Sequence, residues 1–373
     1  MTSSNQLPDA GADGSSVDAD SRDASFRQAL ARSSAAEIRL TAPSGSQVAL
    51  SGDRPTGQLH LGHLLGTLSN RVRLQQLGVP LVLVIADYQV LTDRDSTGPL
   101  REQVRSLVAD YLAAGVDPDR AVIFPHSAVP ALNQLILPFL GLVTDAELRR
   151  NPTVKDEARA AGRPLSGLLL TYPVHQSADI LACGGTVVPI GRDQLPHLEL
   201  TRTIARRFNQ RFGPVFEMPE PLLTGNSTVL GTDGEKMSKS RGNAITLGAD
   251  EDTCARRLRS FRTDSMREIT YSPQNRPEVA SLLGIIGALA GRDPIDVAAE
   301  IGTGGSAALK AMAVEVVNES LRPLRTRRRG LIADPGHLDG VLLDGMAQAN
   351  EMASATLSRV RAAMGMDYLR PPG

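Results

Sequence analysis

The sequence contains no tryptophan, and aromatic residues make up 3% of its 373 positions. Its two cysteines, Cys183 and Cys254, are too few for a disulfide framework or a four-ligand zinc site. No apolar run approaches the roughly 20 residues that a helix needs to cross a bilayer. The first residues also lack the basic start and apolar stretch of a secretory signal. These absences predict a cytoplasmic protein that has no membrane partner.

An excess of charge of one sign is missing too, because 40 Lys and Arg residues stand against 41 Asp and Glu residues. The net charge of −1 argues against general affinity for nucleic acid, so a nucleic-acid partner would have to be bound by a local basic patch. What the chain does contain is typical of globular proteins, with 41% hydrophobic and 22% charged residues. Its length leaves room for two domains of ordinary size.

The expected elements divide the chain into an N-terminal tail and an α/β domain. Residues 1–45 are rich in Ser, Ala, Asp and Gly and are expected to be mostly disordered, with a short amphipathic helix around Phe26, Leu30 and Ile38 as the alternative. Residues 46–245 alternate helices with apolar runs such as "PLVLVIAD", which indicate strands buried on both faces. This alternation predicts a Rossmann-like parallel sheet whose ligands bind beyond the carboxyl ends of the strands.

From residue 246 onward the expected elements are all helices. The change of pattern predicts an all-helical second domain over residues 246–338. We expect the last segment, residues 339–373, to be a C-terminal helix that packs back towards the α/β domain.

The stretch "SGDRPTGQLHLGHLLG" places His60 and His63 three positions apart, around Gly62. At this spacing both rings lie on one face of the first helical turn, where unpaired N–H groups attract anions. Gly62 has no side chain, so a flat ring could lie against its backbone. The pattern indicates a phosphate site, and an ordinary polar first turn is the alternative.

The stretch "GTDGEKMSKSRGN", residues 231–243, clusters Lys236 and Lys239 between glycines. Such a loop suits closure over phosphates, because a departing pyrophosphate needs positioned cations and Mg²⁺. A solvated surface loop is the alternative.

Together the two stretches resemble the signatures of the class I aminoacyl-tRNA synthetases, a His-x-Gly-His tetrapeptide and a Lys-Met-Ser-Lys-Ser loop. The resemblance implies that the two histidines contact the phosphates of ATP, that Gly62 lies under the adenine, and that the two lysines stabilise pyrophosphate. It implies catalytic roles for His60, His63, Lys236 and Lys239, with ATP as a substrate that carries Mg²⁺ and with no other metal. The implied ATP site comprises Arg54, Gly62, His63, Asp193, Lys236, Met237, Ser238 and Lys239.

The stretch "LLLTYPVHQSADILACGG" places Tyr172, Gln176 and Asp179 at helical positions i, i+4 and i+7. A polar face on an otherwise apolar helix indicates an acceptor for a ligand N–H or O–H, although Asp179 could instead have a structural role. The chain from about residue 47 to about residue 366, including "PIGRDQLPHLELTR", resembles the tryptophanyl-tRNA synthetases.

This second resemblance implies that Asp179 accepts the indole N–H and that Tyr172 and Gln176 hold the amino group of the substrate. The implied tryptophan site comprises Leu50, Gly52, Gln89, Tyr172, Gln176, Asp179 and Gln194. Two positions depart from the family, because Arg54 replaces a common Gln and Gln89 replaces a common His.

The expected reaction is activation of L-tryptophan by ATP and transfer to the 3′-terminal ribose of tRNA(Trp). A tyrosyl enzyme is one alternative, but Leu50 stands where tyrosyl enzymes place a Tyr. A regulatory paralogue that binds tryptophan or RNA is a second alternative, and a small-molecule nucleotidylyltransferase is a third. Neither the regulatory paralogue nor the nucleotidylyltransferase needs every one of these motifs.

Two arginine clusters are candidates for contacts with RNA phosphates, and solvated helix ends are the alternative. The family resemblance further implies that the helical domain reads the anticodon and that two subunits form a homodimer. The first cluster comprises Arg322, Arg325, Arg327, Arg328 and Arg329, and the second comprises Arg256, Arg257, Arg259 and Arg262.

Overall fold

The computed structural model describes residues 14–41, 47–92, 97–161, 164–223, 229–239 and 241–368. Five parallel strands form one sheet in the order β3-β2-β1-β4-β5. The strands are β1 (Ala49–Asp53), β2 (Leu81–Ile85), β3 (Ala121–Pro125), β4 (Val187–Ile190) and β5 (Glu220–Leu223). The chain winds outward from β1 in one direction and then, from β4, in the other. The strand order therefore reverses direction between β1 and β4, and such sheets bind ligands at the carboxyl ends of the strands at this switch point.

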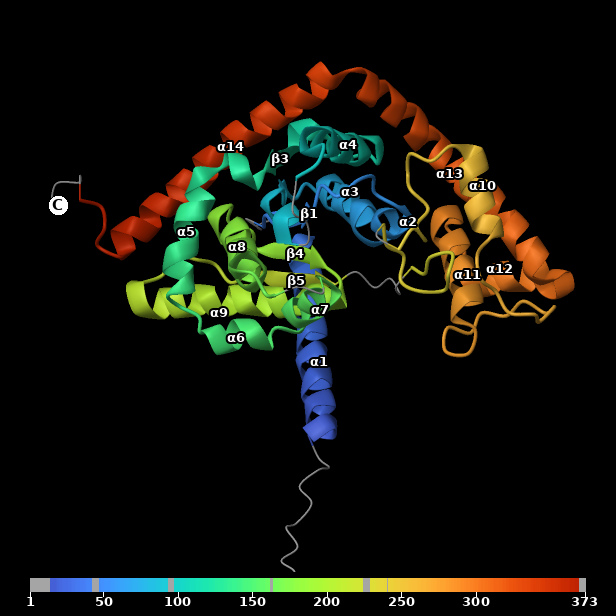
Figure 1. Ribbon diagram of the computed structural model, residues 1–373, viewed down its shortest axis with the longest axis horizontal. Helices are drawn as coiled ribbons and strands as arrows, with labels where there is room; N and C mark the ends of the chain where they lie inside the picture. The colour runs from blue at the N-terminus through green and yellow to red at the C-terminus, as the bar shows by residue number, and fades with distance from the viewer. Residues whose placement is uncertain are drawn as a thin grey trace, which may run out of the picture.

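Helices cover both faces of the sheet (Figure 1). Because side chains alternate along a strand, Leu81, Leu83 and Ile85 belong to the core on one face, and Val82 and Val84 to the core on the other. The helices of this domain are α2 (Leu61–His63), α3 (Ser69–Gln76), α4 (Leu100–Ala113), α5 (Pro130–Leu140), α6 (Asp145–Arg150), α7 (Pro152–Ala161), α8 (Gly167–Ala182) and α9 (Leu195–Phe212).

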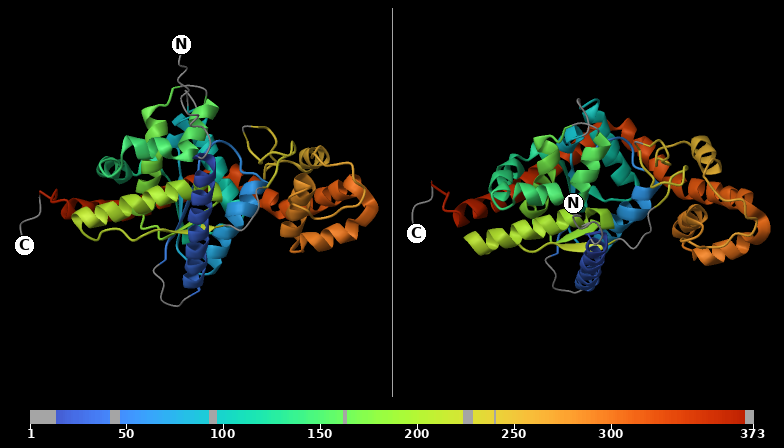
Figure 2. Two further views of the ribbon diagram at one scale, coloured as in Figure 1. Left: turned by 90° about the horizontal axis from the view of Figure 1, so that it is seen from below. Right: turned by 60° about the horizontal axis from the view of Figure 1, so that its bottom comes forward.

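The remaining part of the chain is helical and lies to one side of the sheet (Figures 1 and 2). Its first helices pack on one another, and the two long ones form an arch back over the α/β domain, against α4 and then β3. The helices are α10 (Glu251–Arg259), α11 (Pro277–Ala290), α12 (Pro294–Ile301), α13 (Gly305–Ala333) and α14 (Pro335–Ala363).

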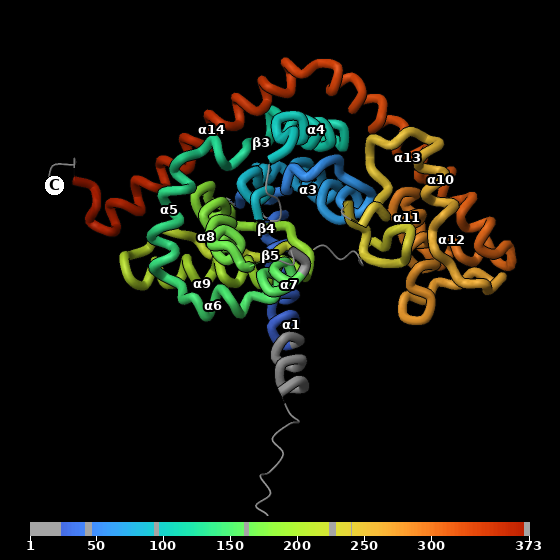
Figure 3. The backbone as a smooth tube through the Cα atoms, in the orientation of Figure 1, coloured from blue at the N-terminus to red at the C-terminus, as the bar shows by residue number. Residues whose placement is uncertain are grey.

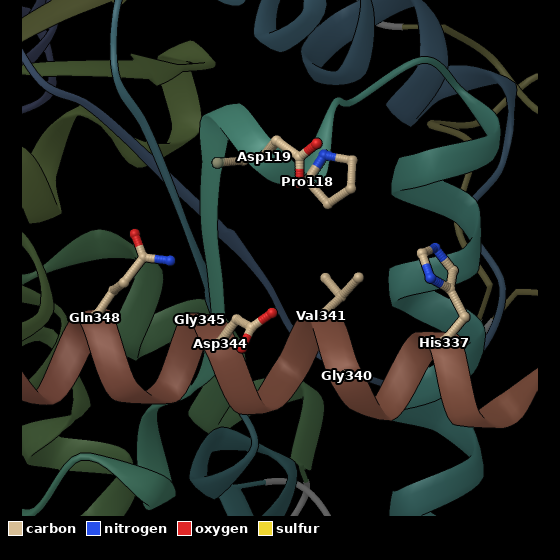
Figure 4. A pocket seen from close by; sticks show the side chains of 9 residues that line it. Pro118, Asp119, His337, Gly340, Val341, Asp344, Gly345 and Gln348 are labelled. Carbon is tan, nitrogen blue, oxygen red and sulfur yellow. The ribbon is translucent and has the colours of Figure 1, made fainter.

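Helix α14 approaches β3 closely because it carries a glycine at the crossing point. A Cβ atom on Gly345 would lie 2.0 Å from the carbonyl oxygen of Ile123. Beside this contact, a shallow pocket lies between α14 and the turn that precedes β3, lined by Pro118, Asp119 and His337 among others (Figure 4). The pocket is at the amino end of β3, so it lies away from the carboxyl edge where ligands are expected.

The N-terminal segment differs from its expectation, because helix α1 runs from Gly14 to Leu40. Its buried stripe is built from small residues, Ala29, Ser33 and Ala36, whereas Leu30 and Ile38 are exposed. The segment is thus an ordered helix that packs on the edge strand β5 (Figure 2). The prediction of a mostly disordered tail is wrong for residues 14–40. Residues 1–13 and 42–46 lie outside the described residues.

Polar contacts fix α1 in place. The Ser33 hydroxyl accepts the Leu223 N–H at 2.8 Å, and Arg32 contacts both Glu199 of α9 and Glu220 of β5. Glu37 pairs with Arg73 of α3 at 2.5 Å.

The predicted fold class, a Rossmann-like parallel sheet joined to an all-helical region, is confirmed. Among the helices of the described residues, none combines the length and the apolar character that a membrane span requires.

Candidate active site

The two histidines of the first motif lie in the turn that enters α2. His60 caps the helix, with its Nδ1 accepting the Gly62 N–H at 3.1 Å, and His63 Nδ1 accepts the His60 N–H at 3.3 Å. Because both Nδ1 atoms act as acceptors, the proton of each neutral ring is on Nε2. Each Nε2–H is therefore a donor suited to a phosphate oxygen.

The same turn keeps both histidines neutral. Burial lowers the pKa of His60 to about 3, with His63 and Lys239 adding to the effect. Burial likewise lowers the pKa of His63 to about 4, although Asp53 opposes it. The ring centroids are 3.8 Å apart, and a Cβ on Gly62 would lie 3.0 Å from the His60 ring. A side chain at this position would thus displace the His60 ring.

Backbone hydrogen bonds join the histidine turn to the segment that follows the lysine loop. The Leu61 N–H donates to the Ile245 carbonyl at 3.0 Å, and the Leu247 N–H donates to the Leu59 carbonyl at 2.9 Å. His60 and Thr246 form an antiparallel bridge between these bonds. The chain after β5 passes α2, which Figure 1 labels, before it enters the helical region (Figures 1 and 3). The two motifs are therefore attached to each other and not merely neighbours.

Both lysines of the loop reach groups that follow strand ends. Lys239 Nζ donates to the Gly57 carbonyl at 2.8 Å, in the loop after β1. Lys236 Nζ lies 3.4 Å from Asp193 Oδ2, in the turn after β4, where Gln194 Nε2 also contacts that carboxylate at 3.5 Å. Three residues expected at the ATP site, Lys236, Lys239 and Asp193, are thus brought to one edge of the sheet.

The loop is held from within by a residue that the sequence analysis did not identify. Asn243 is 1% exposed, and its Oδ1 accepts the Ser238 N–H at 2.8 Å. Its Nδ2 donates to Asp233 Oδ1 at 2.7 Å and to the Lys236 carbonyl at 3.2 Å. The Met237 side chain is buried in the core and anchors the loop.

The predicted specificity carboxylate lies in a buried hydrogen-bonded network. His126 Nε2 accepts the Tyr88 N–H at 3.0 Å, so the ring proton is on Nδ1. That proton points at Asp179, whose carboxylate oxygens lie 3.3 and 3.4 Å from Nδ1. His126 is completely buried and Asp179 is nearly so. The remaining acceptor capacity of Asp179 is free of this bond and suits a second N–H.

His126 was missed because a single histidine forms no motif. It directly follows the run "RAVIFP", which contains β3, and the rule that ligands bind beyond strand ends was the available signal. His175 also lies here, with its ring stacked on His126 at 4.3 Å and its pKa lowered by burial. Gln89, which stands where the family commonly has a His, contacts His175 Nδ1 through its Nε2 at 3.4 Å. It therefore belongs to the same network.

Three of these groups could in principle hold a metal ion. Ligand atoms of His126, His175 and Asp179 lie within 4.8 Å of one another. Both nitrogens of His126 are engaged, however, and a ligand nitrogen must offer a lone pair. The donor set therefore fits a hydrogen-bonded network better than a metal centre.

Tyr172 is positioned by a chain of side chains from the first turn of α9. Asn151 Nδ2 lies 3.2 Å from His197 Nδ1, and His197 Nε2 lies 3.1 Å from the Tyr172 hydroxyl. Burial lowers the pKa of His197 to about 4, so the ring is neutral. Gln176 is half-buried one turn further along α8.

The last predicted residues lie on and after β1. Leu50 is buried in the same core as Ala178 of α8, and a Cβ on Gly52 would lie 2.7 Å from the Val84 carbonyl. Arg54, which stands where the family commonly has a Gln, forms an ion pair with Glu157 of α7 at 3.7 Å. This ion pair therefore connects the loop after β1 to α7.

Comparisons with known proteins agree with this geometry. Residues 44–322 match the family described as tRNA synthetases class I (W and Y). The tryptophan–tRNA ligase of Treponema pallidum is 42% identical over 330 residues, which cover 85% of this chain and 96% of that protein. The corresponding ligase of Thermotoga maritima is 37% identical and covers 86% of this chain and 99% of its own length.

A solved structure is similar over the same extent. The tryptophanyl-tRNA synthetase from Campylobacter jejuni, complexed with ADP and tryptophan, superposes with a TM-score of 0.73 at 29% identity. The match covers 86% of this chain and 100% of that one.

Proposed function

This chain belongs to the tryptophan–tRNA ligase family of class I tRNA synthetases, and from that premise we propose that it attaches L-tryptophan to tRNA(Trp). In the first step a tryptophan carboxylate oxygen attacks the α-phosphorus of ATP and pyrophosphate leaves. In the second step a hydroxyl of the terminal ribose of the tRNA attacks the adenylate carbonyl and AMP leaves. The observation that carries the proposal is the buried Asp179 carboxylate held by His126, in a chain whose histidine turn is hydrogen-bonded to the segment after the lysine loop.

The residues of the phosphate site would stabilise the charge that develops on pyrophosphate. Lys236 and Lys239 supply positive charge, and the neutral His60 and His63 donate hydrogen bonds from Nε2. Mg²⁺ prefers oxygen ligands, whereas these groups are cations and N–H donors. We therefore expect Mg²⁺ to be carried by the phosphates of ATP and not by this cluster.

The acceptor at Asp179 supports tryptophan as the substrate. Its free acceptor capacity would receive the indole N–H, while Leu50 offers nothing to a phenol hydroxyl. The tyrosine alternative is not favoured by the ligase relatives either. A regulatory paralogue would be expected to lose a histidine or lysine of the two motifs, and this chain retains both pairs.

For tRNA, we propose that the helical region reads the anticodon and that α10 supplies phosphate contacts. Arg256 and Arg259 of α10 are exposed. Arg327 and Arg328 of the other cluster are occupied in packing α13 on α4 and are not proposed to contact RNA. We also propose a homodimer, which sedimentation equilibrium tests directly.

Amino-acid-dependent exchange of pyrophosphate into ATP, measured with each of the twenty amino acids, tests the function. Fast exchange with tryptophan and slow exchange with tyrosine is the expected result. Equal exchange with the two amino acids would overturn the substrate assignment, and no exchange with any of them would overturn the function.

A further inference from the structure

Two adjacent arginines attach α13 of the helical region to α4 of the α/β domain. Arg327 donates to the Ala113 carbonyl through Nε at 2.9 Å and Nη2 at 2.6 Å. Arg328 donates through Nε to Asp110 at 2.5 Å and through Nη2 to the Ser106 hydroxyl at 2.7 Å. Both arginines therefore contribute to docking, but their acceptors differ in kind.

The acceptor of Arg328 is connected to the histidine turn. Asp110 is fully buried, and its second oxygen accepts the Leu59 N–H at 2.7 Å. Leu59 immediately precedes His60, and its carbonyl is the one that accepts the Leu247 N–H. The peptide that leads into the turn is thus held on one side by a carboxylate and on the other by the segment after the lysine loop.

A buried carboxylate keeps its charge and orientation only while its cationic partner is present. The Arg328 side chain is 12% exposed, so water has little access to replace it. Its guanidinium also lies against the turn after the lysine loop, where a Cβ on Gly248 would be 3.1 Å from Arg328 Cζ. Arg328 of α13 therefore contacts α4 directly and lies against the turn after the lysine loop. Through Asp110 it is also connected to the histidine turn.

Resting on the proposed function, we propose that Arg328 and Asp110 are positioning residues for adenylate formation. Arg328 orients the Asp110 carboxylate, the carboxylate fixes the Leu59 peptide, and the peptide fixes the histidine rings at the phosphates. A shift of α13 relative to α4 would therefore be transmitted to the catalytic edge. The helical region, which lies to one side of the sheet, gains an influence on the chemical step.

Arg328→Gln and Arg327→Gln form a matched pair that separates positioning from docking. In the full chain, Arg328→Gln should lower kcat for exchange by roughly ten- to hundredfold, as expected for a lost charged hydrogen bond, with the KM for tryptophan unchanged. The Leu59 amide should exchange faster with deuterium. Arg328→Lys, which restores the charge but not the fork, should be intermediate. Arg327→Gln should lower the melting temperature but leave kcat and Leu59 exchange at wild-type values.

Equal losses of kcat in the two Gln variants would overturn the positioning role, and so would wild-type kcat and Leu59 exchange in Arg328→Gln. If Arg328→Gln does not fold, Arg328→Lys decides, because a reduced kcat with faster Leu59 exchange supports the proposal and wild-type values contradict it. If the wild-type chain showed no pyrophosphate exchange into ATP, that result would contradict the proposed function. Deuterium exchange of the Leu59 amide would still test the positioning role.

Discussion

Asp179→Asn is the substitution that tests the proposed pocket most directly, because it preserves the shape of the side chain. In the wild-type chain the carboxylate accepts the Nδ1–H of His126 and has capacity for one more donor. An asparagine has a single acceptor oxygen and an NH₂ group. The Tyr88 N–H donates to His126 Nε2 at 3.0 Å, which favours the tautomer whose proton is on Nδ1 and faces position 179.

In that tautomer the amide presents its NH₂ group either to His126 or to the indole N–H, and both are donors. Loss of a charged acceptor weakens a hydrogen bond by about 1.5–3 kcal/mol, and an unpaired buried donor costs about 1–3 kcal/mol more. The sum of about 2.5–6 kcal/mol predicts a fall in kcat/KM for tryptophan of roughly 10²–10⁴-fold. The KM for ATP should stay close to the wild-type value, because Asp179 lies in a different network from the lysine loop.

The assay compares tryptophan with its benzothienyl analogue, in which sulfur replaces the indole N–H. Wild type should strongly prefer tryptophan, and Asp179→Asn should lose most of that preference. Because the chain contains no tryptophan, fluorescence of the ligand itself can report binding without a tryptophan background. An unchanged preference in a variant that melts like wild type would refute the role of Asp179 as the indole acceptor.

Three further predictions concern other parts of the chain. Lys239→Ala should slow adenylate formation by about 2–4 kcal/mol in single-turnover assays and leave tryptophan binding unchanged, since the lysine is placed at the leaving group. Because the pKa values of His60 and His63 are lowered to about 3 and 4, both are neutral at pH 6–8, and kcat/KM for ATP should show no inflection near pH 6.5. Their contribution to stability, present above pH 6.5, should be lost as the pH falls towards 4 in denaturant titrations. Ala36→Glu should lower the free energy of unfolding by about 2–3 kcal/mol, whereas Ile38→Glu on the exposed face should leave it unchanged; equal effects would contradict the docking of α1.

The sequence predicted the sheet and the two motifs well because each depends on neighbours in the chain. The run over residues 81–85 is apolar at every position since the strand is buried on both faces. The spacing of His60 and His63 is a property of one helical turn. Residues that act through distant partners could not be identified in this way. His126 and Asn243 are single polar residues whose roles depend on which segments the fold brings beside them.

Hydrophobic patterning failed for α1 for a different reason. The helix packs closely on a strand edge, so its buried face needs small side chains such as Ala29 and Ala36. The larger Leu30 and Ile38, which suggested the apolar face, are exposed. The arginine cluster illustrates a similar limit, because composition cannot distinguish Arg328, which meets a buried carboxylate, from a solvated arginine.

The position of α1 has a consequence for how the chain is made. Ser33 and its partner Leu223 are 190 residues apart in sequence, and Arg32 and Glu199 are 167 apart. The helix therefore leaves the ribosome long before β5 and α9 are synthesised. While most of the α/β domain is being made, the surface on which α1 packs is absent. A face of alanine and serine exposes little apolar surface during that time. The feature that hides α1 from hydrophobic patterning thus also protects the nascent chain from aggregation before the sheet edge is complete.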